Sequence, residues 1–255
     1  MKTMIKRAAL VAALALGVVA PAFAAEGEVE LPKLDWSFNG VFGTYDRAQL
    51  QRGYKVYKEV CSSCHSMKYI AFRNLGDIGY NEAQVKALAA GYQITDGPND
   101  DGEMFQRPGL PSDIFPAPFA NEKAARAANG GAYPPDLSLL AKAREGGPNY
   151  IHAILTGYVD APADFTVAEG KSYNKYFPGY NISMPKPLSD DQVTFDDGTK
   201  STLDQQATDV AAFLMWTAEP KLEERHRMGF KVIIFLVVLT GLFIAAKKRI
   251  WRDVH

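Results

Sequence analysis

Two long apolar runs mark the pattern of hydrophobic and polar positions, and a longer region of mixed composition separates them. The second run, residues 228–246, contains one charged residue, Lys231, near its start. A helix of about 20 apolar residues can cross the hydrocarbon core of a bilayer, and Lys231 can extend its amine to the interface. The pattern therefore predicts a C-terminal transmembrane helix over residues 228–246, with a buried helix of a soluble protein as the alternative.

The first run lies within residues 1–24, which have the organisation of a secretory signal peptide. Basic residues precede the apolar run at 8–20, and Ala22-Phe23-Ala24 provides a small-residue cleavage site. The tail at 247–255 is basic, and the positive-inside rule places it in the cytoplasm. We therefore predict a single-pass protein of the bacterial inner membrane with a periplasmic domain over residues 25–227.

Two stretches of helical periodicity lie near the ends of this domain. The first has one apolar face, at intervals of four, three and four residues, formed by Leu50, Tyr54, Tyr57 and Cys61. The second runs from 207 to 217, and Pro220 ends it. Asp46 and Thr202 can cap the two helices, because each is followed three residues later by glutamine. We expect the two helices to pack against each other.

The residues between them predict short helices and long ordered loops, with no β-rich domain. The helices are expected at residues 82–91, 121–129, 138–144 and 150–155. Gly, Pro and Asp are frequent over residues 76–120, which favours loops, and residues 25–44 are expected to form an extended arm. The predicted fold class is mainly α, with long loop insertions and one C-terminal transmembrane helix.

Charge is distributed unevenly along the chain. The whole chain carries a formal charge of −1, but residues 25–227 hold 20 Lys and Arg against 28 Asp and Glu, a net charge of −8. The most acidic segment contains Asp96, Asp100, Asp101 and Glu103. An acidic face speeds encounter with a basic partner, although an ordinary solubilising surface has the same composition.

Residues 58–67, KEVCSSCHSM, carry the strongest chemical signal. Cys61, Cys64 and His65 form a C-x-x-C-H motif, the attachment signature of a c-type haem. Each thiol can add to one vinyl group of the porphyrin, and the adjacent imidazole then lies under the iron. We predict one covalently attached haem c. The alternatives are a zinc half-site, for which further cysteines are lacking, and a thioredoxin-like pair or structural disulfide.

The iron needs a second axial ligand, and a methionine opposite the histidine holds the potential high. The candidates by residue type are Met67, Met104, Met184, Met215, Met228 and His152. Met184 is favoured because prolines on both sides stiffen its loop, whereas Met67 is tied to the same side of the ring as His65. His152 and an open site remain as alternatives.

Other residues can complete the pocket. Arg126 and Arg144 are equal candidates for binding the haem propionates, and either can instead be a solvated helix residue. Tyr133, Tyr150 and Phe177 can line the ring or belong to the core. Their positions in the chain do not separate these roles.

Seven segments of the chain carry a family resemblance. They are RGYKVYKEVCSSCHSM (52–67), DGPNDDGEMFQRPG (96–109), AARAANGGAYPPDLS (124–138), LTGY (155–158), YFPGYNISMPKPL (176–188), FDDGT (195–199) and WTAEPKLEERHRMG (216–229). Together they resemble the bacterial form of the cytochrome c1 family, the haem subunit of the quinol:cytochrome c oxidoreductase (cytochrome bc1 complex). The resemblance implies a class I cytochrome c-like domain.

The resemblance also implies roles for particular residues. Cys61 and Cys64 are implied as the covalent anchors, and His65 and Met184 as the axial ligands. The implied pocket residues, with Arg144 preferred to Arg126 for the propionates, are Asn129, Pro134, Pro135, Arg144, Tyr150 and Phe177. Some bacterial members carry an additional cysteine pair before the methionine, which this chain lacks. Its Met184 loop is therefore expected to be held by packing and prolines alone.

The function implied is that of a one-electron carrier within a quinol–cytochrome-c reductase. It would accept an electron from the Rieske iron-sulfur protein and pass it to a soluble or tethered cytochrome c, with cytochrome b as partner in a dimeric complex. No substrate bond is made or broken on such a chain, and no nucleic-acid partner is expected. Two other hypotheses stay open: a free-standing tethered cytochrome feeding a terminal oxidase or reductase, and a haem sensor or peroxidase with an open iron site.

Overall fold

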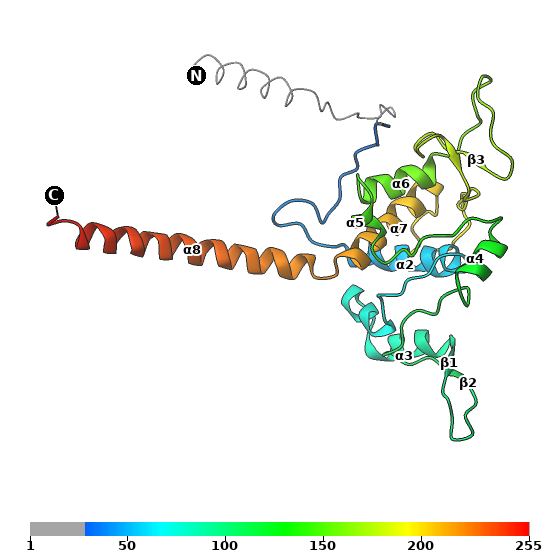
Figure 1. The fold of residues 1–255 in the computed structure, drawn as a ribbon, viewed down its shortest axis with the longest axis horizontal. Coiled ribbons are helices and arrows are strands. Elements are labelled where there is room, and N and C mark those ends of the chain that lie inside the picture. The colour runs from blue at the N-terminus through cyan, green and yellow to red at the C-terminus, as the bar shows by residue number, and fades with distance from the viewer. Residues whose placement is uncertain (1–28, 255) are drawn as a thin grey trace, which may run out of the picture.

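The structure, a computed structural model, describes residues 29–254, so the predicted signal peptide at 1–24 lies outside the described residues. A helical domain lies at one end of the molecule, and one long helix, α8 (Leu222–Ile250), extends away from it (Figure 1). Within the described residues, the strands form two short antiparallel pairs. The prediction of a mainly α fold is confirmed.

Helices α2 (Arg47–Glu59) and α7 (Leu203–Ala218) form the centre of the domain, and both begin at the predicted caps. The Asp46 carboxylate accepts hydrogen bonds from two backbone N–H groups of the first turn of α2. The Thr202 hydroxyl accepts one from Gln205 N at 3.1 Å. Each cap satisfies N–H groups that have no partner inside the helix, which is why the helices start there.

The two helices cross in direct backbone contact, as predicted. Gly53 lies at the crossing, and a Cβ at this position would overlap the carbonyl group of Asp209 on α7. The buried rings of Tyr54, Tyr57 and Phe213 fill the interface, with the Phe213 centroid 5.8 and 5.9 Å from those of the two tyrosines. The absence of a side chain at Gly53 is therefore what allows this approach.

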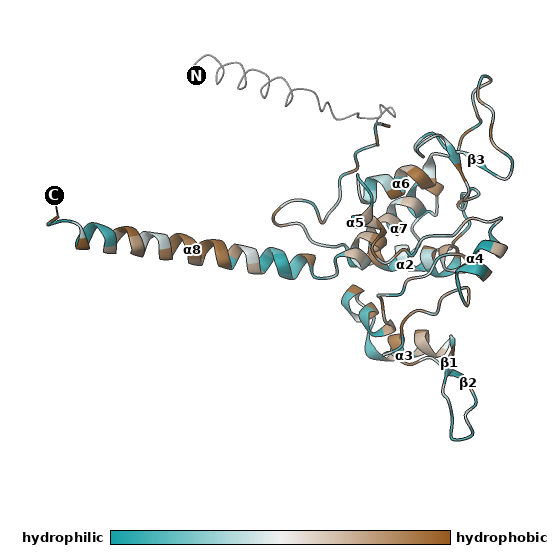
Figure 2. Ribbon diagram, viewed as in Figure 1, coloured by the Kyte–Doolittle hydropathy of each residue, from teal (hydrophilic) through white to brown (hydrophobic). Residues whose placement is uncertain are grey.

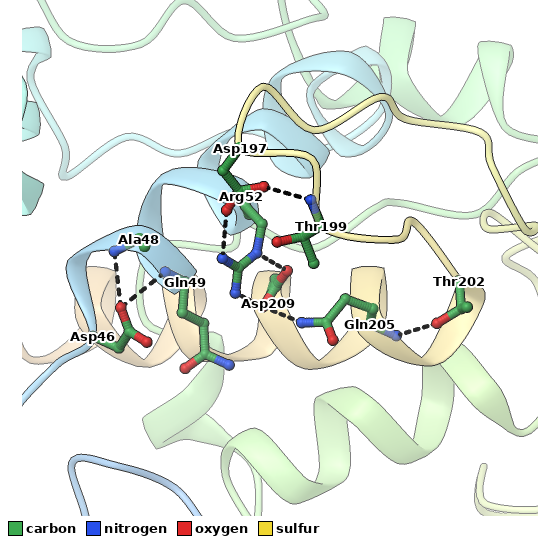
Figure 3. A network of polar contacts seen from close by, with 9 residues as sticks. All are labelled: Asp46, Ala48, Gln49, Arg52, Asp197, Thr199, Thr202, Gln205 and Asp209. Carbon is green, nitrogen blue, oxygen red and sulfur yellow. Dashed lines mark hydrogen bonds and ion pairs between the residues drawn. The ribbon is translucent and has the colours of Figure 1, made fainter.

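A polar cluster also fastens α2 to α7 (Figure 3). The Arg52 guanidinium donates to Asp209 through Nε (2.7 Å) and Nη2 (3.2 Å), and to Asp197 through Nη1 (2.8 Å). The Asp209 side chain has no exposed surface, and this burial raises the pKa of its carboxyl, while Arg52 opposes the rise. We call Arg52, Asp197 and Asp209 the α2–α7 clamp.

Short helices surround this pair. They are α3 (Glu82–Ala90), α4 (Glu122–Ala128), α5 (Leu140–Ala143) and α6 (Pro148–Thr156), with 3₁₀ turns η1 (Cys61–Ser63) and η2 (Phe72–Ile78). All four α-helices lie where the sequence predicted them, although α5 is a single turn. The turn η2 was not predicted. Its buried residues Phe72, Leu75 and Ile78 recur every third position, the period of a 3₁₀ helix.

Two hairpins interrupt regions that were predicted as loops. They are β1 (Gln93–Asp96) with β2 (Phe105–Pro108), and β3 (Ser172–Tyr173) with β4 (Asn181–Ile182). Arg107 holds the first hairpin in place through ion pairs with Asp96 and, at 2.6 Å, with Asp113. The strand side chains are mostly exposed or half-buried, so no alternation of apolar and polar residues marked them in the sequence.

Helix α8 is, within the described residues, one helix long and apolar enough to cross a membrane, with a mean hydropathy of 2.5 over its apolar stretch. It is polar at both ends and hydrophobic between them (Figure 2). It begins at Leu222, so the charged residues before the predicted span are already helical. Glu223 and Glu224 in its first turn complement the positive end of the helix dipole.

Candidate haem-binding site

The C-x-x-C-H motif follows directly on α2. Cys61 opens the turn η1, and its carbonyl oxygen accepts hydrogen bonds from Cys64 N (3.2 Å) and His65 N (2.9 Å). This turn places both thiols and the imidazole on one short loop at the end of a packed helix. The prediction that a helix precedes the motif is confirmed, and a thioredoxin-like pair would follow a strand instead.

His65 is oriented by a carbonyl group from a distant segment. Its Nδ1 lies 2.8 Å from the carbonyl oxygen of Pro135, and because a carbonyl can only accept, Nδ1 carries the proton. Burial lowers the pKa of His65, which favours the neutral ring. The lone pair is then on Nε2, and a hydrogen bond of this kind is what orients a metal-bound histidine. The surroundings of His65 therefore suit a histidine that would bind iron through Nε2.

The surroundings of the Cys61 thiol favour its protonated form. Burial raises the pKa of the Cys61 thiol to about 12, and the neighbouring Cys64 adds to the rise. Cysteines of redox-active pairs have lowered pKa values, because the thiolate is the reactive form. The environment of Cys61 therefore argues against dithiol redox chemistry.

Asp136 was not predicted as a site residue, yet it organises the contact between the motif and the segment that orients His65. Its carboxylate accepts hydrogen bonds from Ser66 Oγ (2.7 Å) and Ser138 N (2.9 Å). Burial alone would raise the pKa of Asp136, but these hydrogen bonds lower it. The result is a fixed position for the Pro135 carbonyl. From sequence, Asp136 could be interpreted only as the start of a helix.

Met184 lies two residues after β4. Hydrogen bonds connect this part of the chain to α6 and to Tyr158, which follows α6. The Tyr158 hydroxyl donates to the Met184 carbonyl at 2.9 Å. Asn174, which is fully buried, donates through Nδ2 to the Ile154 carbonyl in α6 at 2.7 Å. Met184 itself is partly buried and packs against the hydrophobic core.

The prediction that packing and prolines alone hold this loop is wrong. The hydrogen bonds of Tyr158 and Asn174 attach it, and the β3–β4 hairpin leads directly into it. Phe165, which precedes the hairpin, forms an aromatic cluster with the hairpin residues Tyr173 and Tyr180, with ring centroids 5.0 to 5.8 Å apart. Hydrogen bonds, strand pairing and aromatic contacts therefore all help to hold the segment that leads to Met184.

The other methionines lie in positions less suited to an axial ligand. Met67 has no exposed surface and belongs to the core, and Met215 packs against the core from within α7. Met104 and Met228 are 60% and 55% exposed, on the β1–β2 loop and on α8. The structure thus favours Met184, as the sequence did, and its role as ligand stays a prediction.

His152, the alternative ligand, has a structural contact. Its Nε2 lies 2.8 Å from Asp204 Oδ1, and this hydrogen bond joins α6 to the first turn of α7. The ring is buried between these helices. The interpretation of His152 as a helix histidine with a hydrogen-bond partner is therefore the better one.

The two candidate arginines differ in their partners. Arg126 donates to Glu122 (2.8 Å) within α4, and its guanidinium lies 5.5 Å from the ring centroid of Tyr133. Arg144 is exposed beside Tyr150, where burial raises the pKa of the phenol and Arg144 opposes the rise. Arg144 also donates through Nη1 to the Ala143 carbonyl at 3.0 Å, and the choice of Arg144 for the propionates stays a prediction.

The remaining pocket residues fall into separate groups. A cavity of about 150 Å³ beside Cys64 is lined in part by Tyr133 and Pro134. Asn129 closes the end of α4, where its Nδ2 donates to the Ala125 carbonyl at 2.7 Å. Phe177 is half-buried, and its backbone N–H donates to the Asn174 carbonyl at 3.2 Å. The C-x-x-C-H motif is thus in contact with residues 134–138. The segment of Phe177 and Met184 is hydrogen-bonded instead to α6 and to Tyr158 just after it.

Comparison with known proteins decides the family. The model of the cytochrome c1 family matches residues 36–254. The chain belongs to the cytochrome c1 family. Cytochrome c1 of Rhodospirillum rubrum is 53% identical over 270 residues, which cover 100% of this chain and 99% of that protein.

Two further relatives are a longer bacterial protein and a mitochondrial protein. Cytochrome b/c1 of Bradyrhizobium diazoefficiens is 54% identical over 271 residues, which cover 97% of this chain but 39% of that longer protein. The mitochondrial cytochrome b-c1 complex catalytic subunit of Candida albicans is 46% identical over 232 residues, which cover 91% of this chain and 81% of that protein.

Membership of the cytochrome c1 family confirms the fold class and the cofactor. The mainly helical domain fits a class I cytochrome fold. Cytochrome c1 family proteins bind one covalently attached haem c, and Cys61, Cys64 and His65 are placed as such a motif requires. The roles of the individual pocket residues stay predictions.

Proposed function

We propose that this chain is the one-electron carrier subunit of a quinol:cytochrome c oxidoreductase, which accepts electrons from the Rieske iron-sulfur protein and passes them to cytochrome c. The observation that carries the proposal is the C-x-x-C-H loop whose histidine keeps Nε2 available, in a chain of the cytochrome c1 family. The bound haem supplies a reversible one-electron iron couple. The chain makes and breaks no substrate bond of its own.

In this proposal the protein holds the cofactor from two sides. Cys61 and Cys64 form the thioethers, and His65 and Met184 bind the iron. The hydrogen bond from His65 Nδ1 supports the first side, because it fixes the ring that must face the iron. The hydrogen bond to the Met184 carbonyl supports the second, because it limits the movement of the loop.

The membrane arrangement follows from the two ends of the chain. Residues 228–246 span the inner membrane, residues 25–227 lie in the periplasm, and the tail at 247–255 lies in the cytoplasm. The basic residues in the last turn of α8, Lys247, Lys248 and Arg249, support this orientation. The name cytochrome b/c1 of the Bradyrhizobium relative supports cytochrome b as partner.

The axial ligand is tested by Met184→Leu in the purified, haem-bearing complex. The haem should stay covalently attached, while the reduction potential falls by a large margin and electron delivery to cytochrome c stops, because the sulfur ligand is lost. Met104→Leu, the same change at an exposed methionine of the β1–β2 loop, should leave the potential unchanged. An unchanged potential in Met184→Leu would remove this residue from the site.

The acceptor is tested at the loop between β1 and β2, whose acidic side chains include Asp100, Asp101 and Glu103, all exposed. Replacing Asp100 and Asp101 by lysine should slow the reaction with a basic cytochrome c, most strongly at low salt, because screening weakens the attraction. The same change at exposed Asp160 and Asp164, in another loop, is the control. Identical salt profiles for both variants and the unmodified protein would exclude the β1–β2 loop from the encounter.

A further inference from the structure

A tight turn in the N-terminal arm carries two strongly exposed apolar side chains. Gly43 N donates to the Gly40 carbonyl at 3.3 Å, which closes a turn with Val41 and Phe42 at its centre. These side chains are 66% and 81% exposed. Single exposed apolar residues are common on proteins, so it is their position relative to α8 that calls for an explanation.

The turn is fixed along one face of α8. Three contacts connect the two segments: Tyr45 N donates to Glu223 Oε1 (2.8 Å), His226 Nδ1 lies 3.3 Å from the Gly43 carbonyl oxygen, and the rings of Phe42 and Phe230 are 6.3 Å apart in an edge-on arrangement. The partners on α8 are three and four residues apart, which places them on the same side of the helix. The base of the turn meets the charged start of α8, and its tip meets Phe230.

This contact sets the depth of the turn. The apolar run of α8 starts at Met228, and with a rise of about 1.5 Å per residue Phe230 lies about 3 Å farther along. Side chains over residues 228–246 are almost all exposed and apolar. Arg227 and Lys231 flank Phe230 in the sequence, as basic residues do at the level of lipid head groups. Phe42 therefore lies where α8 enters the bilayer.

We propose that the turn at residues 40–43 inserts Val41 and Phe42 into the interfacial region of the lipid bilayer, as a second membrane contact beside α8. The proposal goes beyond electron transfer and rests on α8 crossing the membrane. One helix alone leaves the tilt of the attached domain free, whereas a helix and a rigid turn fix it. The buried Trp36 and Phe38 stacked behind the turn, and the Tyr45 contact with α8, make the turn rigid enough for this role.

The test measures the surroundings of the turn in the complex. A nitroxide spin label is attached to Phe42→Cys in the haem-bearing complex, reconstituted into phosphatidylcholine and phosphatidylglycerol vesicles with the haem reduced. The label is specific within this chain, because its two native cysteines, Cys61 and Cys64, are the residues proposed to form the thioethers. Electron paramagnetic resonance then gives collision rates with oxygen, which concentrates in lipid, and with a nickel chelate, which stays in water. Val41→Cys repeats the measurement with Phe42 in place.

Reference labels make the result decisive. Ser112→Cys, on an exposed loop of the domain, reports water. Val237→Cys and Phe243→Cys, on different faces of α8, report the bilayer. We expect the oxygen-to-nickel ratio at Phe42 and Val41 to be several-fold above that at Ser112 and below that of the lipid-facing α8 label, because the turn lies at the interface and the α8 labels lie deeper in the bilayer.

Three results would overturn the proposal. Dominant nickel collisions at Phe42 would place the turn in water. Low collision rates with both reagents at Phe42 would show that a protein subunit, not lipid, covers the turn. Water-like ratios at both Val237 and Phe243 would show that α8 does not cross the bilayer, a failure distinct from that of the turn because it would appear in the references.

Discussion

The α2–α7 clamp gives the most direct test of what holds the haem-bearing helix in place. Replacing Arg52 by methionine keeps most of the volume of the side chain but leaves the Asp209 carboxylate buried without its guanidinium partner. Removing one partner of a buried ion pair costs about 3–5 kcal/mol, because the remaining charge is desolvated and unpaired.

The structure lowers this figure for two reasons. The Arg52 side chain is 16% exposed, so water reaches part of the pair. Asp209 also keeps a hydrogen bond from Gln205 Nε2 at 2.9 Å. We therefore expect Arg52→Met to lower the free energy of unfolding by about 2–3 kcal/mol. The double variant Arg52→Met, Asp209→Leu should recover most of this loss, because no unpaired charge is left in the interface.

Urea denaturation of the purified haem-bearing protein, followed by far-ultraviolet circular dichroism, measures the change. Lys55→Met is the matched control, since it removes an ion pair of α2 whose partner, Asp196, is 88% exposed. Exposed pairs contribute about 0–1 kcal/mol. The reasoning would be refuted if Arg52→Met cost no more than Lys55→Met.

The pH dependence of this variant has a definite sign. Burial already raises the pKa of the Asp209 carboxyl, and Arg52 opposes the rise. Without Arg52 the folded-state pKa moves farther above that of the unfolded chain, so the folded state binds the extra proton. The destabilisation should therefore grow as the pH rises from about 4 to about 7, and a constant difference across this interval would contradict the assignment.

Three further predictions follow from single contacts. Gly53→Ala should lower the free energy of unfolding by about 1–3 kcal/mol or more, in the same urea assay, because its Cβ would overlap the backbone of α7. Tyr158→Phe should weaken the attachment of the Met184 loop by about 1 kcal/mol, seen as faster amide hydrogen exchange in that loop, and unchanged exchange would contradict it. The hydrogen bond from Arg107 lowers the pKa of Asp113 to about 2. The ionised Asp113 carboxylate therefore stabilises the folded state fully above about pH 4, and this stabilisation is lost as the pH falls through about 2. In Arg107→Gln the titration of the Asp113 carboxyl, followed by nuclear magnetic resonance, should move up toward 4.

Much of the fold was predictable because its signals are local. A helix cap, an apolar face and a proline stop act within a few residues, so α2 begins where Asp46 indicated, and α7 begins and ends where Thr202 and Pro220 indicated. The 3₁₀ turn and the hairpins were missed. The period of three in η2 was open to detection, whereas the exposed strands of the hairpins carry no apolar alternation.

The sequence by itself determined the chemistry of this protein: a C-x-x-C-H motif, methionines that can face it, and one apolar span. Only the tertiary structure decided how these parts are held. It joins His65 to Pro135 across 70 positions, ties Tyr158 to Met184 across 26, and brings the turn at 40–43 to the start of α8. Hydrogen bonds and ring contacts between distant segments need only one suitable residue on each side, so they leave no periodic pattern that a single sequence could reveal.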